Sequence, residues 1–175
     1  MSRGTQPTGT PLSVGAEGFV AQLRTFTEET PGVQDAVVVS ADGQLMARSS
    51  CGSQPPSGHL AAAVSGIAGL ADGAARAYQL GTLNTVIIDT TLGYLLVSVM
   101  DGPAALGVAA SKSSTISAVA YGMTQFAHRS GPVLTPQVVN ELAEWSRRNT
   151  VAGQPASLTP ASASTARPGL PRPAV

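Results

Sequence analysis

Residues 36–48 read AVVVSADGQLMAR, and this stretch decides the fold class. Its first part, Ala36 to Ser40, is a Val-rich run with apolar residues on both faces of an extended strand. Ala41-Asp42-Gly43 is a strong hairpin signal, and Gln44 to Arg48 returns as a second strand. A strand that is apolar on both faces needs cover on both sides. The stretch therefore predicts a hairpin within a sheet that carries helices on each face.

Helical and extended patterns alternate on either side of this hairpin. A helix precedes it, with apolar residues at helical spacing from Phe19 to Thr30, and Pro31-Gly32 must end that helix. A loop over residues 49–57 and a long helix over residues 58–80 follow it. Three further strands are then predicted, over residues 85–90, 94–100 and 104–110.

Two more helices complete the predicted fold. Ser113 or Ser114 can cap the first of them, and Thr135-Pro136 starts the second. The order of elements is thus α-β-β-α-β-β-β-α, plus an extra C-terminal helix. We expect an α/β fold of the α+β type, in which helices cover both faces of a five-stranded sheet.

The composition divides the chain into four parts. Residues 1–15 and 149–175 are rich in Pro, Gly, Ala, Ser and Thr and have little to bury, so we expect both to be disordered. Residues 16–130 form the predicted domain, and residues 131–148 carry the extra helix. Five prolines fall within residues 149–175, whose only charged residues are Arg167 and Arg172. This segment could be a polyproline II ligand, although a solvated tail is the simpler interpretation.

The overall composition excludes several classes of function. Ten Lys and Arg balance ten Asp and Glu in 175 residues, which argues against a nucleic-acid binder. One cysteine, Cys51, excludes an internal disulfide framework and a zinc cluster built on cysteines. The chain shows no targeting segment and no apolar run long enough to cross a membrane. We expect a cytoplasmic protein without a cofactor or a metal, and without direct membrane insertion.

The long predicted helix, GHLAAAVSGIAGLADGAARAYQL, has two different faces. One face is apolar and can dock on a sheet; it holds Leu60, Val64, Ile67, Ala71, Ala74 and Tyr78. The other face is a stripe of minimal side chains, Ala62, Gly66, Gly69, Gly73 and Ala77. Three glycines inside a helix cost about 2–3 kcal/mol relative to Ala. Close approach of a second helix would offset that cost, so we predict a dimer interface on this stripe. Tight packing of the stripe on its own sheet is the alternative.

The extra C-terminal helix carries one apolar stripe, formed by Val138, Leu142 and Trp145. A free helix of about 13 residues is marginal in water, so this helix needs a surface to pack on. We predict that it is a docking element, on its own domain or on a partner. The short connection at Gly131-Pro132 favours its own domain.

The residues that could support catalysis do not form a recognisable site. His59 and His128 have no metal-ligand spacing, and nothing places a base beside Cys51, so a hydrolase built on Cys51 or on a Ser/His pair is a minor alternative. The sequence LGVAASKSS resembles a phosphate-binding loop that ends in Lys112-Ser113, but Leu106 and Ser111 stand where it needs glycines. We therefore expect no nucleotide binding and no enzymatic activity. Arg48, Arg76 and Arg129 are candidates, only by being basic, for an arginine finger that acts in trans, and nothing in the sequence distinguishes any of them from an ordinary surface arginine.

Two stretches carry a resemblance to a known family. TPGVQDAVVVSADGQLMARSS (residues 30–50) and TVIIDTTLGYLLVSVMDGPAALGVAAS (residues 85–111) flank the small-residue helix. In this order they resemble the Roadblock/dynein light chain family, most closely its small actinobacterial members from conservon-type operons. The resemblance covers Phe19 to Arg129; the C-terminal helix and the Pro-rich tail lie outside it.

The resemblance implies a fold and a function. Family members form homodimers or heterodimers in which two five-stranded antiparallel sheets join edge to edge and the long helices pack together. Bacterial members are associated with Ras-like small GTPases, as regulators or scaffolds. The expected function is therefore a non-enzymatic, homodimeric interaction module that binds and regulates such a GTPase in bacterial signalling. A pure scaffold without effect on GTP turnover is the alternative. The conservon setting also implies a sensor-kinase-like membrane protein as a neighbour, which could recruit this protein to the membrane.

Overall fold

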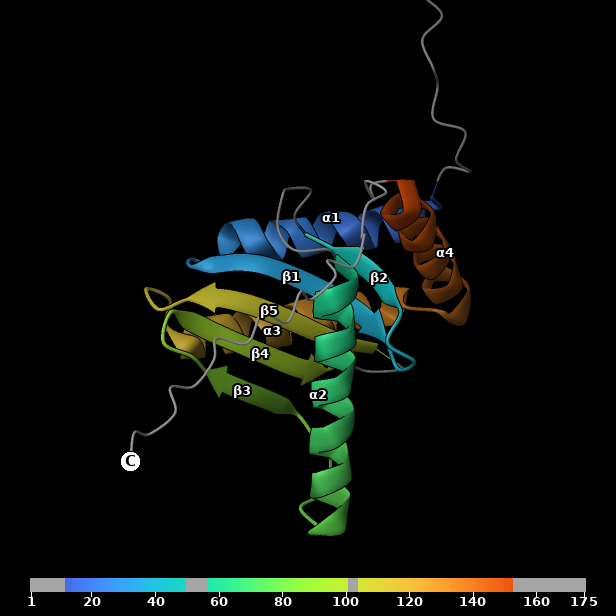
Figure 1. The fold of residues 1–175 in the computed structure, drawn as a ribbon. Helices are drawn as coiled ribbons and strands as arrows, with labels where there is room; N and C mark the ends of the chain where they lie inside the picture. The colour runs from blue at the N-terminus through green and yellow to red at the C-terminus, as the bar shows by residue number, and fades with distance from the viewer. Residues whose placement is uncertain (1–11, 50–56, 101–103, 153–175) are drawn as a thin grey trace, which may run out of the picture.

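The structure is a computed structural model, and it describes residues 12–49, 57–100 and 104–152 of the chain (Figure 1). A helix, a hairpin, a second helix, a three-stranded meander and two further helices follow one another, with a short 3-10 turn between the last two helices. The elements in order are α1 (Val14–Glu29), β1 (Val33–Ser40), β2 (Leu45–Arg48), α2 (Ser57–Ala77), β3 (Thr85–Asp89), β4 (Gly93–Val99), β5 (Ala104–Ser111), α3 (Ile116–Ser130), η1 (Gly131–Val133) and α4 (Pro136–Ala152).

The five strands form one sheet in the order β2-β1-β5-β4-β3, and every neighbouring pair is antiparallel. The hairpin and the meander meet where β1 pairs with β5, with Val38 opposite Leu106. This arrangement places β5 at the centre and leaves β2 and β3 at the two edges. The predicted α+β fold, with a five-stranded antiparallel sheet, is confirmed.

Helices cover both faces of the sheet, as the doubly apolar strand β1 requires. On one face, Val38 and Leu106 pack in a core with Phe19 of α1 and Met123 of α3. On the other face, Val37 and Val39 pack in a smaller cluster with Val64 of α2. Because side chains alternate along a strand, consecutive residues of β1 supply the two clusters.

The contact between α2 and the sheet depends on a glycine in the central strand. A Cβ atom on Gly107 of β5 would lie 2.2 Å from Cγ2 of Val64, which is fully buried. Only glycine leaves room for the Val64 side chain at this point. The missing side chain at Gly107 therefore sets how closely α2 approaches the sheet.

Several helix boundaries differ from the sequence prediction. Helix α1 begins at Val14, inside the segment predicted to be disordered, because the Ser13 hydroxyl accepts a hydrogen bond from the Ala16 backbone. Helix α4 continues to Ala152, four residues beyond the predicted end at Arg148. The long helix α2 ends at Ala77 and not at Leu80, because Gln79 adopts a left-handed conformation with φ 54°.

The predicted cap of α3 was also wrong. Thr115 occupies the cap position, and its side chain makes no capping hydrogen bond. The two serines predicted as caps bond instead within the preceding turn. Ser114 donates to the Ser111 carbonyl at 2.5 Å, and the Ser113 hydroxyl lies 2.6 Å from that of Ser111. These bonds tie the serines to the end of β5 rather than to the helix.

Candidate protein interface

The small-residue stripe of α2 faces away from the sheet. Ala62, Gly66, Gly69, Gly73 and Ala77 are all exposed. A Cβ atom added at any of the three glycines would find, beyond the backbone of α2 itself, no atom of a described residue within 4 Å. Tight packing on the domain's own sheet therefore does not explain these glycines, and the described part of the chain leaves the stripe uncovered.

The apolar face of α2 docks on the sheet along only part of its length. Val64 is buried, and Leu60, Ile67 and Ala71 are half-buried. The sequence also placed Ala74 and Tyr78 on this docking face, and for these two residues it was wrong, because both are exposed. Figure 1 shows the reason: α2 crosses the sheet and its C-terminal part continues beyond β3.

The projecting part of α2 and the turn that follows it expose large apolar side chains beside an open sheet edge. Leu70, Tyr78 and Leu80 are 79%, 78% and 76% exposed. Strand β3 ends the sheet on this side, and no strand in the described part of the chain pairs with its outer edge. We call this region the α2–β3 surface; it comprises the glycine stripe, Leu70, Tyr78, Leu80 and the edge of β3.

Leu70 is a member of this surface that the sequence analysis missed. It lies four residues after Gly66 and three before Gly73, so helical spacing puts it beside the stripe. That spacing was visible in the sequence. A search for small residues alone passed over it.

Helix α4 packs beside the opposite edge of the sheet. Of the predicted docking stripe, Leu142 is fully buried, whereas Val138 and Trp145 are half-buried. The stripe faces α1 and β2 of the same chain, with Val138 3.5 Å from the position that a Cβ of Gly15 would take. The Ser146 hydroxyl donates to the carbonyl of Met46 in β2 at 2.8 Å. The two sheet edges therefore differ: α4 lies against β2, while β3 stays open.

The three arginines considered as fingers have different surroundings. Arg48 forms an ion pair of 2.6 Å with Asp35, and both side chains are largely buried between β1 and β2. Arg76 pairs with Asp72 at 2.5 Å on the exposed side of α2. Arg129 is exposed on α3, on the opposite side of the sheet from α2. Arg48 is thus held in a structural pair, and the three guanidinium groups do not gather at one site.

The region that resembles a phosphate-binding loop has no cradle for phosphate. Leu106, at the first position where a glycine is needed, is fully buried in β5. The Lys112 ammonium donates to the Asp89 carboxylate and lies 4.0 Å from the centre of the Tyr94 ring. The hydrogen bond to Asp89 raises the pKa of Lys112 above its usual range, which keeps this lysine charged and paired.

The residues considered for catalysis lie apart from one another. His59 is exposed at the start of α2, and His128 is exposed in the last turn of α3. Cys51 lies outside the described residues. Within residues 12–49, 57–100 and 104–152, no three His, Cys, Asp or Glu side chains gather as metal ligands would. In the same ranges, no helix has the length and apolar character that a bilayer crossing requires.

The sequence matches the family model of the Roadblock/LC7 domain over residues 20–110. The chain belongs to the Roadblock/LC7 family. The matched residues run from α1 to β5, so they contain α2, the α2–β3 surface and the whole sheet except Ser111. Helices α3 and α4 of this Roadblock protein lie outside the match.

Solved structures with the same fold come from several bacteria. A Roadblock/LC7 domain from Streptomyces avermitilis is 24% identical, with a TM-score of 0.61 over 66% of this chain and 96% of that one. MglB from Myxococcus xanthus is 13% identical, with a TM-score of 0.62 over 66% and 94%. The gliding protein MglB from Thermus thermophilus is 17% identical, with a TM-score of 0.64 over 74% and 97%. No curated protein matches this Roadblock protein significantly.

Proposed function

We propose that this Roadblock protein is a homodimeric, non-enzymatic module that binds and regulates a Ras-like small GTPase. The α2–β3 surface is the observation that carries the proposal, because it combines an open strand edge with an open stripe of small residues. Membership of the Roadblock/LC7 family and the fold shared with MglB support it.

The α2–β3 surface has the properties of a self-complementary interface. An unpaired edge strand is a template for another strand, and two β3 strands related by a two-fold axis would extend the sheet. The same axis would bring the two α2 stripes together, where Gly66, Gly69 and Gly73 permit close helix approach. Leu70, Tyr78 and Leu80 would then leave water, which is the main driving force for such association.

The other sheet edge supports this assignment. Strand β2 lies against α4, and the carbonyl of Met46 is already bonded to Ser146. A second copy therefore has one open edge to pair with in the described part of the chain, and that edge is β3. A dimer through β3 leaves α1, α3 and α4 at the periphery, free to contact other proteins.

The proposed action on a GTPase is regulation by binding. A protein that prefers one conformation of a GTPase shifts its population by the difference in affinity between the two states, without supplying a catalytic group. This is the role we assign, and the pure scaffold differs from it only in having equal affinity for both states. The sensor-kinase-like partner and the cytoplasmic location stay predictions from the resemblance and the composition.

Single-turnover GTP hydrolysis and nucleotide release test the function. The assay uses a Ras-like small GTPase, with increasing amounts of the Roadblock protein. We expect one of the two rates to change and to saturate at a fixed stoichiometry. Binding with both rates unchanged would identify the scaffold, and absence of binding would contradict both proposals.

Two matched variants connect the assay to the dimer. Leu70→Glu places a charge in the α2–β3 surface, and Val14→Glu does the same at a similarly exposed apolar residue on α1. We expect Leu70→Glu to give a monomer by light scattering and to weaken the effect on the GTPase. Val14→Glu should match the wild type in both measurements.

A further inference from the structure

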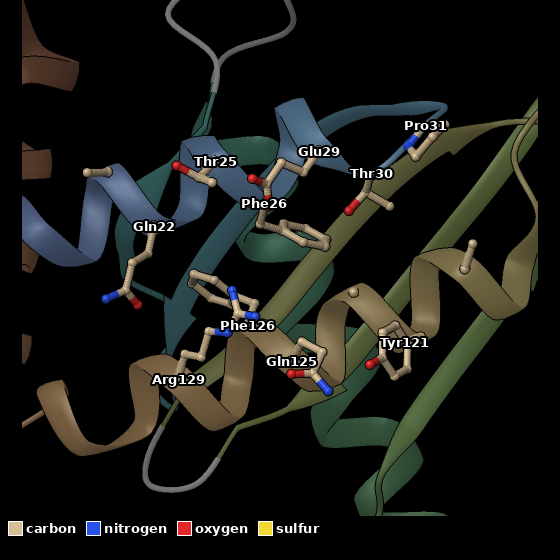
Figure 2. Close-up of a pocket in the computed structure, with 13 residues that line it drawn as sticks. Gln22, Thr25, Phe26, Glu29, Thr30, Pro31, Tyr121, Gln125, Phe126 and Arg129 are labelled. Carbon is tan, nitrogen blue, oxygen red and sulfur yellow. The ribbon is translucent and has the colours of Figure 1, made fainter.

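A groove of about 460 Å³ lies between α1 and α3, on the face of the sheet opposite α2 (Figure 2). Its apolar lining comes from Phe26 and Phe126, which form the inner wall, and from Tyr121, which is two-thirds exposed. Pro31 closes the groove at the end of α1. The groove is separate from the α2–β3 surface, so both can be occupied together.

A glycine in α3 allows the two helices to meet at the bottom of the groove. A Cβ atom on Gly122 would lie 2.9 Å from Phe26 Cε2 and 2.9 Å from Thr30 Oγ1. The absence of a side chain at Gly122 thus lets the Phe26 ring form the floor. The resulting surface is aromatic, with Phe26, Tyr121 and Phe126 among its lining residues.

Polar side chains also line the groove, and one of them has a buried acceptor without a hydrogen-bond partner in the described part of the chain. Gln22 Oε1 is buried, and it has no hydrogen-bond partner within the described residues. Figure 2 shows the Gln22 side chain directed from α1 toward α3. Thr25, Gln125 and Arg129 add donors along the rim, and Glu29 adds a carboxylate at the end nearer Pro31. A buried acceptor without a partner points to a ligand that carries an N–H group.

We propose that this groove binds the Pro-rich segment of the chain's own C-terminus, residues 167–173, RPGLPRP. Pro168 and Pro171 form a P-x-x-P pattern, and such segments dock as polyproline II helices in aromatic-lined grooves. The prolines pack on Phe26, Tyr121 and Phe126. The N–H of Gly169 or Leu170 donates to Gln22 Oε1, and the free backbone carbonyls accept from the rim donors.

The dimensions of segment and groove agree, and Arg172 of the segment is complementary to the Glu29 carboxylate. A polyproline II segment rises about 3.1 Å per residue, so Pro168 and Pro171 lie about 9 Å apart. Gln22 and Glu29 lie seven residues apart on α1, which is about 10 Å at 1.5 Å per residue. With Pro168 beside Gln22, the segment brings Arg172 to the Glu29 carboxylate. The 153–175 tail carries two arginines and no acidic side chain, which matches the carboxylate at that end.

The tail is long enough to reach the groove from the end of α4. Ser13, at the start of α1, bonds to Glu141 of α4 at 2.5 and 2.7 Å. From Glu141 to Ala152 is about 17 Å along α4, and from Ser13 to Gln22 is about 14 Å along α1. The path from Ala152 to Gln22 is therefore no more than about 31 Å plus the length of the Ser13–Glu141 contact. Residues 153–167 can span up to about 50 Å when extended.

Amide NMR spectra of the full chain test the proposal with two matched variants. Pro168→Ala with Pro171→Ala removes the P-x-x-P pattern, and Pro155→Ala with Pro160→Ala removes as many prolines elsewhere in the tail. We expect the first pair to shift the backbone amide signals of residues 25–30 and 121–126, and the second pair to leave them in place. A synthetic peptide of residues 164–175 added to the first variant should return those signals to their wild-type positions.

Charge reversal supplies an independent test. Glu29→Arg should move the amide signals of Gly169, Leu170 and Arg172 toward those of the free peptide, and combining it with Arg172→Glu should restore those of Gly169 and Leu170. The proposal would be overturned if the groove signals kept their wild-type positions in both proline variants, or if they shifted by equal amounts in both. It would also be overturned if diluting the wild-type protein, at concentrations where it stays dimeric, moved the groove signals to their positions in the first proline variant. That result would show that the groove binds the tail of another copy.

Discussion

The hydroxyl of Ser146 donates a hydrogen bond of 2.8 Å to the backbone carbonyl of Met46, one hundred residues earlier in the chain. Ser146 belongs to α4, and Met46 belongs to the edge strand β2. A serine on the helix thus satisfies a backbone acceptor of the edge strand, which an exposed edge would leave to water or to another chain. Helix α4 therefore covers the β2 edge of the sheet.

Leu142→Ala should destabilise the domain by about 2–5 kcal/mol, because the Leu142 side chain is fully buried between α4 and the core. Thermal or urea unfolding of the full chain measures the change. Arg148→Ala, at an exposed position on the same helix, is the matched control and should lie within about 0.5 kcal/mol of the wild type. Equal stability of the two variants would contradict the packing of α4.

Trp145 should report that packing directly. It is the only tryptophan of the chain and is half-buried on α4. Its emission in the isolated protein should be blue-shifted relative to a water-exposed tryptophan, because part of the indole ring is removed from solvent. Adding the GTPase should leave the emission unchanged. A water-like spectrum that shifts only on mixing would show that α4 docks on the partner instead.

The hairpin and the meander could be predicted from the sequence because local patterns determine them. The run Ala36 to Ser40 is apolar on both faces, and Ala41-Asp42-Gly43 has turn chemistry, so the two strands and the need for helices on both faces follow without tertiary information. The glycine stripe of α2 was visible for the same reason, since helical spacing identifies it.

Long-range geometry could not be predicted in this way. Nothing local shows that α2 continues past β3, and so Tyr78 was assigned to the docking face although it is exposed. The groove beside Phe26 exists because Gly122, nearly one hundred residues later, lets α3 approach α1. The buried pair of Asp35 and Arg48 likewise depends on the register of β1 with β2.

Gly107→Ala should destabilise the domain by about 1–3 kcal/mol, since the new methyl group would overlap the Val64 side chain. Val64→Ala makes space at that point and should partly rescue the first substitution. The free energies of unfolding of the two single variants and the double variant form a cycle, and we expect a coupling of about 1–2 kcal/mol. If the changes in the free energy of unfolding of the two single variants simply added in the double variant, α2 would be able to adjust its position on the sheet without strain.

The protein should not bind GTP. Leu106 is buried at one position where a phosphate-binding loop needs glycine, and Ser111 stands at the other. Lys112 is engaged by Asp89 and Tyr94. Calorimetric titration with GTP and Mg²⁺ should give no heat of binding, and Asp89→Ala, which releases the lysine, should not change that result. Micromolar binding by the wild type would show that another site cradles the phosphates.

Gly69→Leu should disrupt the dimer while leaving the single chain at least as stable. The glycine stands in the middle of the α2 stripe, and a Cβ there would have no atom of a described residue within 4 Å, apart from the backbone of α2 itself. Replacing a helical glycine by leucine even favours the helix by up to about 1 kcal/mol. A loss of association would therefore come from overpacking against the second copy and not from unfolding.

Gly18→Leu is the matched control, because Gly18 also lies inside a helix, α1, and no described residue outside the α1 backbone lies within 4 Å of its Cβ position. Light scattering over a dilution series, together with thermal unfolding, measures both variants against the wild type. We expect Gly69→Leu to raise the dimer dissociation constant at least about tenfold, a change of about 1.4 kcal/mol, and Gly18→Leu to leave it unchanged. Both should retain the wild-type fold by circular dichroism. A wild type that is monomeric at micromolar concentration would refute the dimer, and an equal effect of both substitutions would place the interface away from α2.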